Sequence, residues 1–586
     1  MFFNVSVSLK MALFGRATSI FIISNRHCSK LISTFRTSLK CSNPPSQFTF
    51  CGYFIFRRYS TEPDKKRITT LREFVNFDDF INEKKNQAKR SILVEIQNDR
   101  SIPFLHNYCS SFGKIKSIFY YSLADDTHHC LIEFNSEISV KLALESAVHR
   151  DYNSVIPVRS TNFYFRRTKA TFKSTSGEKL PLILGKPILK MSQLFKQLSE
   201  AKTVSEQIEN CYSILKLDDI ELRLRFQMSQ EIERCFLGLF PNVEVLPFGS
   251  TVNGFGRMGC DLDMFVTLDR VKKEDSVQRL VFQTKPSELN GKYHQNIKLL
   301  ETIGEIMKNF VPGVTNVVKI LHARVPIIKF NNSYTGIQCD LSLSNMSALY
   351  MSELLYLYGE IDRRVRPIIF TLRKWAQVKE ITCESPGDHI TNFSLTLLIL
   401  FYLQNKKILP SLQELRKAAT KDDKRVTETG VDCTFARNLY SIKIPKTPNV
   451  DCFTLLKGFF EFYSTFNYKT HGICLQSGML TGKDIYIALF IKNPLEPTLN
   501  VSRNVSFKQI DRIRYYCREA LWLLENETEN SSNSEHWGII GLLKTNQQDK
   551  TTTKKTKKSR KGPPNVLEIM KISGSTNDTN FQFAAN

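Results

Sequence analysis

The sequence lacks the cysteine spacing of a zinc-binding or redox motif. Its fourteen cysteines are scattered through 586 residues without any Cys-x-x-Cys pair, which suggests neither a zinc site nor a disulfide framework. The most apolar stretch near the N-terminus, 11–23, is interrupted by Arg16 and is too short to span a bilayer. We therefore expect free thiols in a reducing compartment and no membrane insertion.

Acidic residues are absent from the first 61 positions. The same segment carries eight Lys or Arg and many Ser, which is the composition of a mitochondrial transit peptide. Arg57-Arg58-Tyr59 looks like a matrix-protease cleavage site, so residues 1–59 are predicted to direct the chain to the mitochondrial matrix and to be removed there. A secretory signal around 11–23 is the alternative, and Arg16 argues against it.

Length and charge indicate a multidomain protein with an anionic partner. A chain of 586 residues exceeds one domain, so two or three are expected. The net charge of +24 favours nucleic acid as the partner. Residues 527–586 are polar and contain seven Lys or Arg between Lys550 and Lys561, which predicts a basic disordered tail that could hold RNA electrostatically.

The most specific pattern is an apolar strand, 243–248, followed by Gly249-Ser250 and then by Asp261-Leu262-Asp263. Glycine lets the backbone approach a ligand, and the amides of such a turn can face phosphate oxygens. Asp261 and Asp263 share one face of a strand, and adjacent carboxylates are held together by a cation such as Mg²⁺. A Gly-rich hairpin with a solvent-facing acidic strand is the alternative. The spacing favours a nucleotidyl-transfer site.

This stretch resembles the signature of the DNA-polymerase-β-like nucleotidyltransferases, in the branch of poly(A) polymerases and terminal uridylyltransferases. The resemblance covers roughly residues 195–525 and implies a third carboxylate from a later strand, which Asp340 supplies. It implies an α+β fold with a palm at 190–345 and a helical poly(A)-polymerase-associated domain at 346–526. It also implies two Mg²⁺ (or Mn²⁺) ions bridged by Asp261 and Asp263, with Asp340 completing the ion that activates an RNA 3′-OH. Gly249 and Ser250 would hold the β- and γ-phosphates.

The same resemblance implies where the triphosphate is bound. Arg373-Lys374-Trp375-Ala376-Gln377 is similar to the segment that reaches the triphosphate with two basic residues. Arg373 fits the first of them, but Gln377 stands where the second is expected. That departure leaves Lys374 or Lys379 to substitute. Ser352 matches a hydroxyl that touches the nucleotide in relatives.

Base recognition is implied by two further segments. Asn392-Phe393 resembles a segment whose aromatic side chain stacks on the base, with Asn392 as a polar neighbour; a role for Phe393 in the helix core is the alternative. Residues 493–503 resemble the nucleotide-recognition loop. Uridylyltransferases place a His at the position of Leu499, where it can hydrogen-bond uracil. Leu499 therefore favours ATP.

Residues 89–168 follow the β-α-β-β-α-β order of an RNA-recognition motif, with the last strand expected at 154–158 and a polar linker at 60–88 before it. An RNA-reading version needs aromatic residues on its third strand, and His129 and Leu131 stand there instead. A protein-docking module is therefore favoured over an RNA reader. It resembles the N-terminal module of mitochondrial poly(A) polymerases, which implies a homodimer.

The predicted function is template-independent addition of adenosines from ATP to the 3′-OH of mitochondrial RNAs, with release of pyrophosphate. A mitochondrial terminal uridylyltransferase is the near alternative, and a CCA-adding enzyme is a more distant one. An inactive RNA-binding scaffold is the alternative from another class, and the intact Asp261, Asp263 and Asp340 argue against it.

Overall fold

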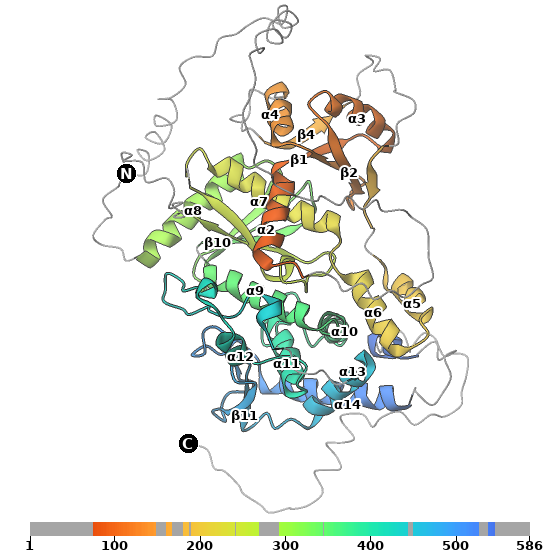
Figure 1. The fold of residues 1–586 in the computed structure, drawn as a ribbon, viewed down its shortest axis with the longest axis vertical. Coiled ribbons are helices and arrows are strands. Elements are labelled where there is room, and N and C mark those ends of the chain that lie inside the picture. The colour runs from red at the N-terminus through yellow and green to blue at the C-terminus, as the bar shows by residue number, and fades with distance from the viewer. Residues whose placement is uncertain are drawn as a thin grey trace, which may run out of the picture. The chain divides into compact units, whose positions relative to one another are not determined.

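A computed structural model of the chain (Figure 1) describes residues 74–147, 160–166, 180–186, 189–240, 242–268, 292–343, 345–443, 449–526 and 537–544. All of them belong to one unit, Glu73–Asn586. The predicted transit peptide and the predicted strand at 154–158 lie outside the described residues. Among the residues that are described, no helix combines the length and apolar composition needed to cross a membrane.

The N-terminal module has the predicted β-α-β-β-α-β order. Its elements are β1 (Ser91–Ile96), α3 (Ile102–Ser110), β2 (Ile115–Ser122), β3 (His128–Phe134), α4 (Glu137–Ser146) and β4 (Asn162–Phe165). The fourth strand therefore lies after the predicted position. A short strand, β5 (Leu182–Leu184), pairs in parallel with β2 and gives the sheet order β4-β1-β3-β2-β5.

Both faces of this sheet are apolar, and each packs against a different layer. Side chains such as Cys130 join a core that includes residues of α3 and α4. Because side chains alternate along a strand, Leu131 points to the opposite face. There it joins Leu93, Phe119 and residues of helix α7 (Asp219–Phe236) in the palm core. The module is thus docked on the palm of the same chain.

The third strand contributes polar contacts to this docking. His129 is buried, with its ring stacked 5.4 Å from that of Tyr121 and edge-on to Tyr334 of the palm. The Tyr121 hydroxyl donates a 2.7 Å hydrogen bond to the Tyr334 carbonyl. The positions where an RNA-recognition motif would present stacking aromatics are therefore occupied by contacts to the palm.

An ion-pair network surrounds the fully buried Glu133 of β3. Its carboxylate accepts from Arg223 of α7 at 2.8 Å, Lys116 at 3.0 Å and Arg90 at 3.2 Å. Burial raises the pKa of Glu133, but these cations outweigh it and hold the pKa below the usual range. Satisfied in this way, a buried carboxylate ties the module to the palm.

The prediction of a linker over 60–88 is wrong from Phe77 onward, because helix α2 (Phe77–Lys89) forms there. Phe77 and Ile81 lie one helical turn apart and are buried together with Tyr356. Lys84 forms a 2.6 Å ion pair with Asp219 at the start of α7. The segment is polar on average, but its apolar residues form a stripe that packs on the palm.

The palm is a five-stranded mixed sheet in the order β6-β7-β10-β9-β8. Its strands are β6 (Glu244–Phe248), β7 (Leu262–Thr267), β8 (Val314–Ile320), β9 (Ile327–Asn332) and β10 (Gln338–Leu343). Only β7 and β10 are paired in parallel, and the other neighbours are antiparallel. Residues of α7 and α8 (Lys292–Phe310) share its core.

The remaining helices form the predicted helical domain around the largest core. The helices of this part are α9 (Met346–Ile361), α10 (Val365–Val378), α11 (Asn392–Asn405), α12 (Leu412–Lys417), α13 (Cys452–Thr465) and α14 (Phe507–Asn526). A small sheet joins them, made of β11 (His471–Cys474), β12 (Met479–Gly482) and β13 (Ile491–Lys492). Helices α5 (Met191–Ser199) and α6 (Val204–Leu215) also contribute to this core, although the sequence groups them with the palm. The α+β class is confirmed.

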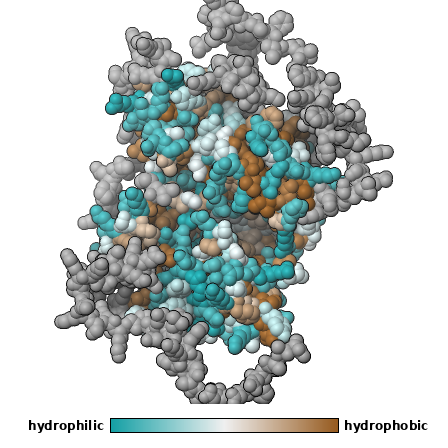
Figure 2. Space-filling model, turned by 180° about the vertical axis from the view of Figure 1, so that it is seen from behind, coloured by the Kyte–Doolittle hydropathy of each residue, from teal (hydrophilic) through white to brown (hydrophobic). Residues whose placement is uncertain are grey.

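The predicted tail is not polar throughout. Helix α15 (Ile539–Leu543) is buried in the helical core, and the side-chain oxygen of Gln207 accepts a 2.9 Å hydrogen bond from the Ile539 amide. Four of its five residues are Ile or Leu, so burial of this short apolar run overrides the polar composition around it. The surface seen from behind is mainly hydrophilic or mixed, with a hydrophobic area in its upper right part (Figure 2).

Candidate active site

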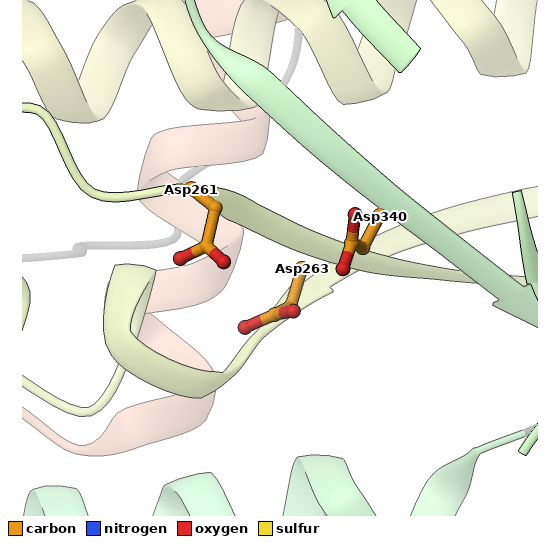
Figure 3. Close-up of side chains that lie close together, drawn as sticks. All are labelled: Asp261, Asp263 and Asp340. Atoms are coloured by element: carbon orange, nitrogen blue, oxygen red, sulfur yellow. The ribbon is translucent and has the colours of Figure 1, made fainter. Parts of the chain in front are cut away.

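Three aspartates converge where β7 and β10 run side by side (Figure 3). The parallel register of these strands pairs Asp263 directly with Asp340. Asp261 stands one residue before β7 begins. One carboxylate oxygen from each of the three lies within 4.8 Å of the other two. The structure therefore brings together the three carboxylates that the sequence predicts.

The alternation of β7 fixes which way these side chains point. Leu262, Met264 and Val266 are buried in the palm core. Asp263 therefore projects from the opposite face of the sheet, as does Phe265, whose ring lies 6.0 Å from that of Phe248. A one-residue shift of register would bury the carboxylate and expose the apolar side chains.

The three carboxylates perturb one another. Burial, followed by repulsion from Asp261 and Asp340, raises the pKa of Asp263 to about 7, although Lys329 opposes the shift. Lys329 lies beside Asp340 in the antiparallel register of β9 and β10. Its ammonium donates to both oxygens of Asp340, at 2.8 and 2.7 Å. The site thus concentrates negative charge that one lysine partly neutralises.

The donor set fits a hard divalent cation. All three groups offer carboxylate oxygens, which Mg²⁺ and related ions prefer. The raised pKa of Asp263 indicates that its charged form lacks full compensation within the chain. A bound divalent cation would supply that compensation. Asp261, Asp263 and Asp340 therefore form a candidate site for divalent metal ions.

Gly249 begins a short turn, Gly249–Thr251, that leads directly away from β6. Its φ of +66° is favourable only for glycine, and a Cβ atom there would lie 2.7 Å from an oxygen of Asp263. Its amide donates a 2.8 Å hydrogen bond to the hydroxyl of Ser352, which in turn donates to the Ala348 carbonyl at 2.7 Å. Ser352 therefore fixes the turn, and the Gly249 amide is already engaged.

A cleft of about 1410 Å³ opens over these groups. Residues of the palm and of the helical domain line it together. The predicted site residues among them are Gly249, Ser250, Asp261, Asp263, Ser352, Arg373, Lys374, Asn392, Phe393 and Leu499. The cleft is large enough for a nucleotide and part of a second substrate.

The predicted base-binding residues lie together on the helical side of this cleft. Phe393 is half-buried: it packs against the helical core and also lines the cleft. Asn392 is exposed at the first position of α11. Leu499 is half-buried in a loop that Asn493 stabilises. The side-chain oxygen of Asn493 accepts hydrogen bonds from the amides of Leu495 and Glu496 at 3.0 and 3.1 Å.

The predicted phosphate-binding cations differ in their surroundings. Arg373 donates to Thr396 Oγ1 at 2.6 Å and to the Phe255 carbonyl at 2.8 Å. Burial, with a smaller contribution from a neighbouring arginine, lowers its pKa to about 10. Lys374 lines the cleft. Lys379 does not: it is buried and forms a 3.1 Å ion pair with Glu519. Lys374 and Lys379 are the two lysines that could substitute for the basic residue expected at Gln377. Of these, only Lys374 lines the cleft.

Comparison with known proteins decides the family. A model of the central palm domain of mitochondrial-like poly(A) RNA polymerases matches residues 204–360. An RL domain matches 76–148, and a Cid1 family poly(A) polymerase model matches 454–494. The mitochondrial poly(A) RNA polymerase of Drosophila melanogaster is 39% identical over 80% of this chain and 80% of its own. The chain belongs to the mitochondrial poly(A) RNA polymerase family.

Other members extend the likeness to solved structures. The human mitochondrial poly(A) RNA polymerase is 34% identical over 86% of this chain and 87% of its own. A crystal structure of mtPAP in complex with ATPγS is 33% identical, covers 80% of this chain and 99% of that one, and has a TM-score of 0.72. Membership of this family confirms that the chain is a nucleotidyltransferase enzyme, as the Asp261-x-Asp263 motif predicts.

Two residues that contact the candidate site were not predicted from the sequence. Lys329 is one, and its strand position opposite Asp340 could have revealed it. Arg225 is the other: its fully buried guanidinium is ion-paired with Glu221 and donates to the Cys260 carbonyl at 2.6 Å. It thereby holds the backbone just before Asp261. No local signal marks Arg225, because its contact to Cys260 spans 35 residues.

Proposed function

We propose that this member of the family adds adenosines from ATP to the 3′-OH of mitochondrial RNAs in the matrix and releases pyrophosphate. The observation that carries the proposal is the in-register triad of Asp261, Asp263 and Asp340 beside the Gly249 turn. The family is named for mitochondrial polymerases, and the acid-free, basic N-terminal segment supports import into the matrix.

The residues of the palm account for the chemistry. Two bound divalent cations would neutralise the phosphates and would stabilise the charge on the attacking and leaving oxygens of an in-line displacement. Asp261 and Asp263 would hold both ions, and Asp340 would hold the one beside the RNA 3′-OH. Gly249 lets the turn approach the phosphates closely, and Ser250 offers a hydroxyl from the same turn. Positioning and charge neutralisation carry most phosphoryl-transfer catalysis.

Mg²⁺ is the proposed physiological ion, with Mn²⁺ as a substitute. Three carboxylates and no nitrogen or sulfur ligand make an all-oxygen site among the described residues, which suits Mg²⁺ when substrate phosphates and water complete its shell. The nearby thiol of Cys260 is engaged as an acceptor of the Ser250 hydroxyl, at 3.5 Å.

Selection of ATP is proposed to depend on the loop that carries Leu499. An apolar side chain cannot hydrogen-bond uracil, whereas a His at this position can. Structures of mtPAP have been solved with ATPγS, UTP, GTP and CTP. Binding alone therefore does not separate the nucleotides in that relative, and selectivity is best measured as a competition between them during extension.

A homodimer is proposed through the N-terminal module. The RNA-recognition-like face of its sheet is occupied by the palm, so a partner copy must use another surface. Strand β5 offers one, since Leu182, Ile183 and Leu184 are all exposed at the edge of the sheet. Among the described strands, β5 has no partner on its outer side, and an unpaired apolar edge is a template for strand pairing. The basic residues of the tail would add salt-dependent affinity for RNA.

The test is primer extension with residues 60–586, a short RNA and all four nucleotides, singly and in competition, in Mg²⁺ and in Mn²⁺. We expect extension dominated by ATP, and none with Asp261→Ala/Asp263→Ala. Dominance of UTP would overturn the assignment of Leu499 and leave the mechanism standing. Absence of extension with every nucleotide would favour the inactive RNA-binding scaffold.

A further inference from the structure

The segment of α10 that is expected to bind the triphosphate has one basic residue fewer than the family resemblance implies. Gln377 occupies the position, and it lines the cleft together with Lys374. The Lys374 ammonium donates a 3.2 Å hydrogen bond to the Gln377 side-chain oxygen. Gln377 thus orients a neighbouring cation, but it adds no charge of its own. ATP carries about four negative charges, so a positive charge from another element would compensate.

The palm loop between Gly249 and Asp261 supplies such a charge in Arg257. Arg257 forms an isolated antiparallel bridge with Lys216. The Leu217 amide donates to the Gly256 carbonyl at 3.0 Å, and the Met258 amide donates to the Leu215 carbonyl at 2.9 Å. These two hydrogen bonds flank Arg257 and fix its backbone. Its side chain is exposed and lines the cleft.

Close packing around Gly256 fixes the position of the loop that carries Arg257. A Cβ atom at Gly256 would lie 2.5 Å from the carbonyl oxygen of Ser250 and 2.6 Å from the side chain of Leu217. The loop therefore passes directly against the phosphate-binding turn, and no larger residue than glycine fits at that crossing. Arg257 is the next residue, so it is held beside the turn that approaches the nucleotide.

Arg257 also lies close to both cations of α10. Burial lowers the pKa of Arg373 and of Lys374, and in each case the positive charge of Arg257 lowers it further. Within the described residues, no carboxylate forms an ion pair with Arg257 or Lys374. Uncompensated like charges that converge on a cleft mark a site for an anion.

We infer that Arg257, together with Lys374, binds the terminal phosphates of the nucleoside triphosphate. Arg257 thereby replaces the basic side chain that the family pattern has at the position of Gln377. This inference rests on the proposed function and names the groups that hold its substrate. A guanidinium can bind phosphate with two parallel hydrogen bonds. Arg257 thus supplies the additional positive charge from the palm, which also carries the aspartates, and not from the helical domain.

The experiment compares Arg257→Gln and Arg257→Lys with the wild type. Arg518→Gln is the matched control, because Arg518 is exposed on α14 and outside the cleft lining. We expect Arg257→Gln to raise the KM for ATP on the order of tenfold, the size of one charge-assisted hydrogen bond. The KM for RNA should not change, and Arg257→Lys should recover part of the loss. Adding Gln377→Lys to Arg257→Gln should also restore ATP affinity.

A second readout does not require turnover. Binding of inorganic tripolyphosphate, measured by calorimetry, should weaken in Arg257→Gln by the same factor as the KM for ATP, whereas binding of adenosine should not change. Equal tripolyphosphate binding in wild type and variant would overturn the inference, as would a rise confined to the KM for RNA. An inactive wild type would refute the proposed function instead, and the calorimetry would still decide the role of Arg257.

Discussion

Replacing Asp263 with asparagine should stabilise the metal-free protein while it abolishes nucleotidyl transfer. The pKa of Asp263 is raised from 3.8 to about 7 by burial and by its two neighbouring aspartates. One pKa unit corresponds to about 1.4 kcal/mol. The charged carboxylate therefore lowers the stability of the metal-free fold by up to about 4 kcal/mol above pH 7.

The sign of the pH dependence follows from the same shift. The folded state holds the proton more tightly than the unfolded chain does, so ionisation of Asp263 begins to cost stability once the pH exceeds about 4. The cost grows by about 1.4 kcal/mol for each pH unit and is complete near pH 7. Asp263→Asn has no ionisable group at this position. The stability of the variant relative to the wild type should therefore rise by about 3 kcal/mol between pH 5 and pH 8.

Thermal denaturation in EDTA at pH 5 and pH 8 measures the difference. We compare the melting temperature of Asp263→Asn with that of the wild type at each pH. This difference should be larger at pH 8 than at pH 5 by about 5 °C. Asp422→Asn, which removes an exposed carboxylate outside the cleft, should show no such change. Adding Mn²⁺ should stabilise the wild type more than Asp263→Asn. The same melting difference at both pH values, or a variant less stable than wild type at pH 8, would refute the reasoning.

Three further predictions concern the site and its support. Lys329→Met removes the ammonium that pairs with Asp340, so the melting temperature in EDTA should fall by a few degrees and the rise on adding Mn²⁺ should increase; equal rises in variant and wild type would contradict this. Leu499→His should raise the ratio of UTP to ATP incorporation at least severalfold in a competition assay, and an unchanged ratio would show that the loop does not select the base. Arg223→Met should leave the buried Glu133 short of a partner and destabilise the protein by about 3 kcal/mol above pH 5. This loss of stability should shrink as the pH falls through the depressed pKa of Glu133, because Glu133 is then neutral in both the wild type and the variant. A difference in melting temperature that does not depend on pH would exclude the ion pair as its source.

The pair Asp261 and Asp263 of the acidic triad could be predicted because its determinants are local, whereas the prediction of Asp340 rests on the family resemblance. Asp263 belongs to β7, whose apolar residues alternate with it, and Asp261 stands one residue before that strand, so the alternation fixes the face. The support of the triad could not be predicted in this way. The contact between Ser352 and Gly249 joins residues 103 positions apart, and it turns a hydroxyl expected to touch the nucleotide into one that also fixes the turn. Such pairings depend on how the domains pack, which the periodicity of one segment does not report.

Two of the errors in segment assignment, those at α2 and α15, have a common physical cause. Both α2 and α15 lie in stretches whose average composition is polar, yet each has an apolar stripe or run that finds a partner far away in the sequence. Phe77 packs on Tyr356, and Ile539 packs in the helical core. Average composition predicts whether a segment can form a core alone, but it does not predict whether a segment is buried by another.

The buried face of the N-terminal module explains why its third strand has no base-stacking aromatics. An aromatic that stacks on a base must be reachable by RNA, whereas His129 and Leu131 are almost fully buried against the palm. The loss of the stacking platform and the docking of the module are therefore one structural constraint. RNA must approach Asp340 along another surface. Arg324 and Lys186 are exposed and line the cleft, so we expect their positive charges to attract RNA phosphates along that path.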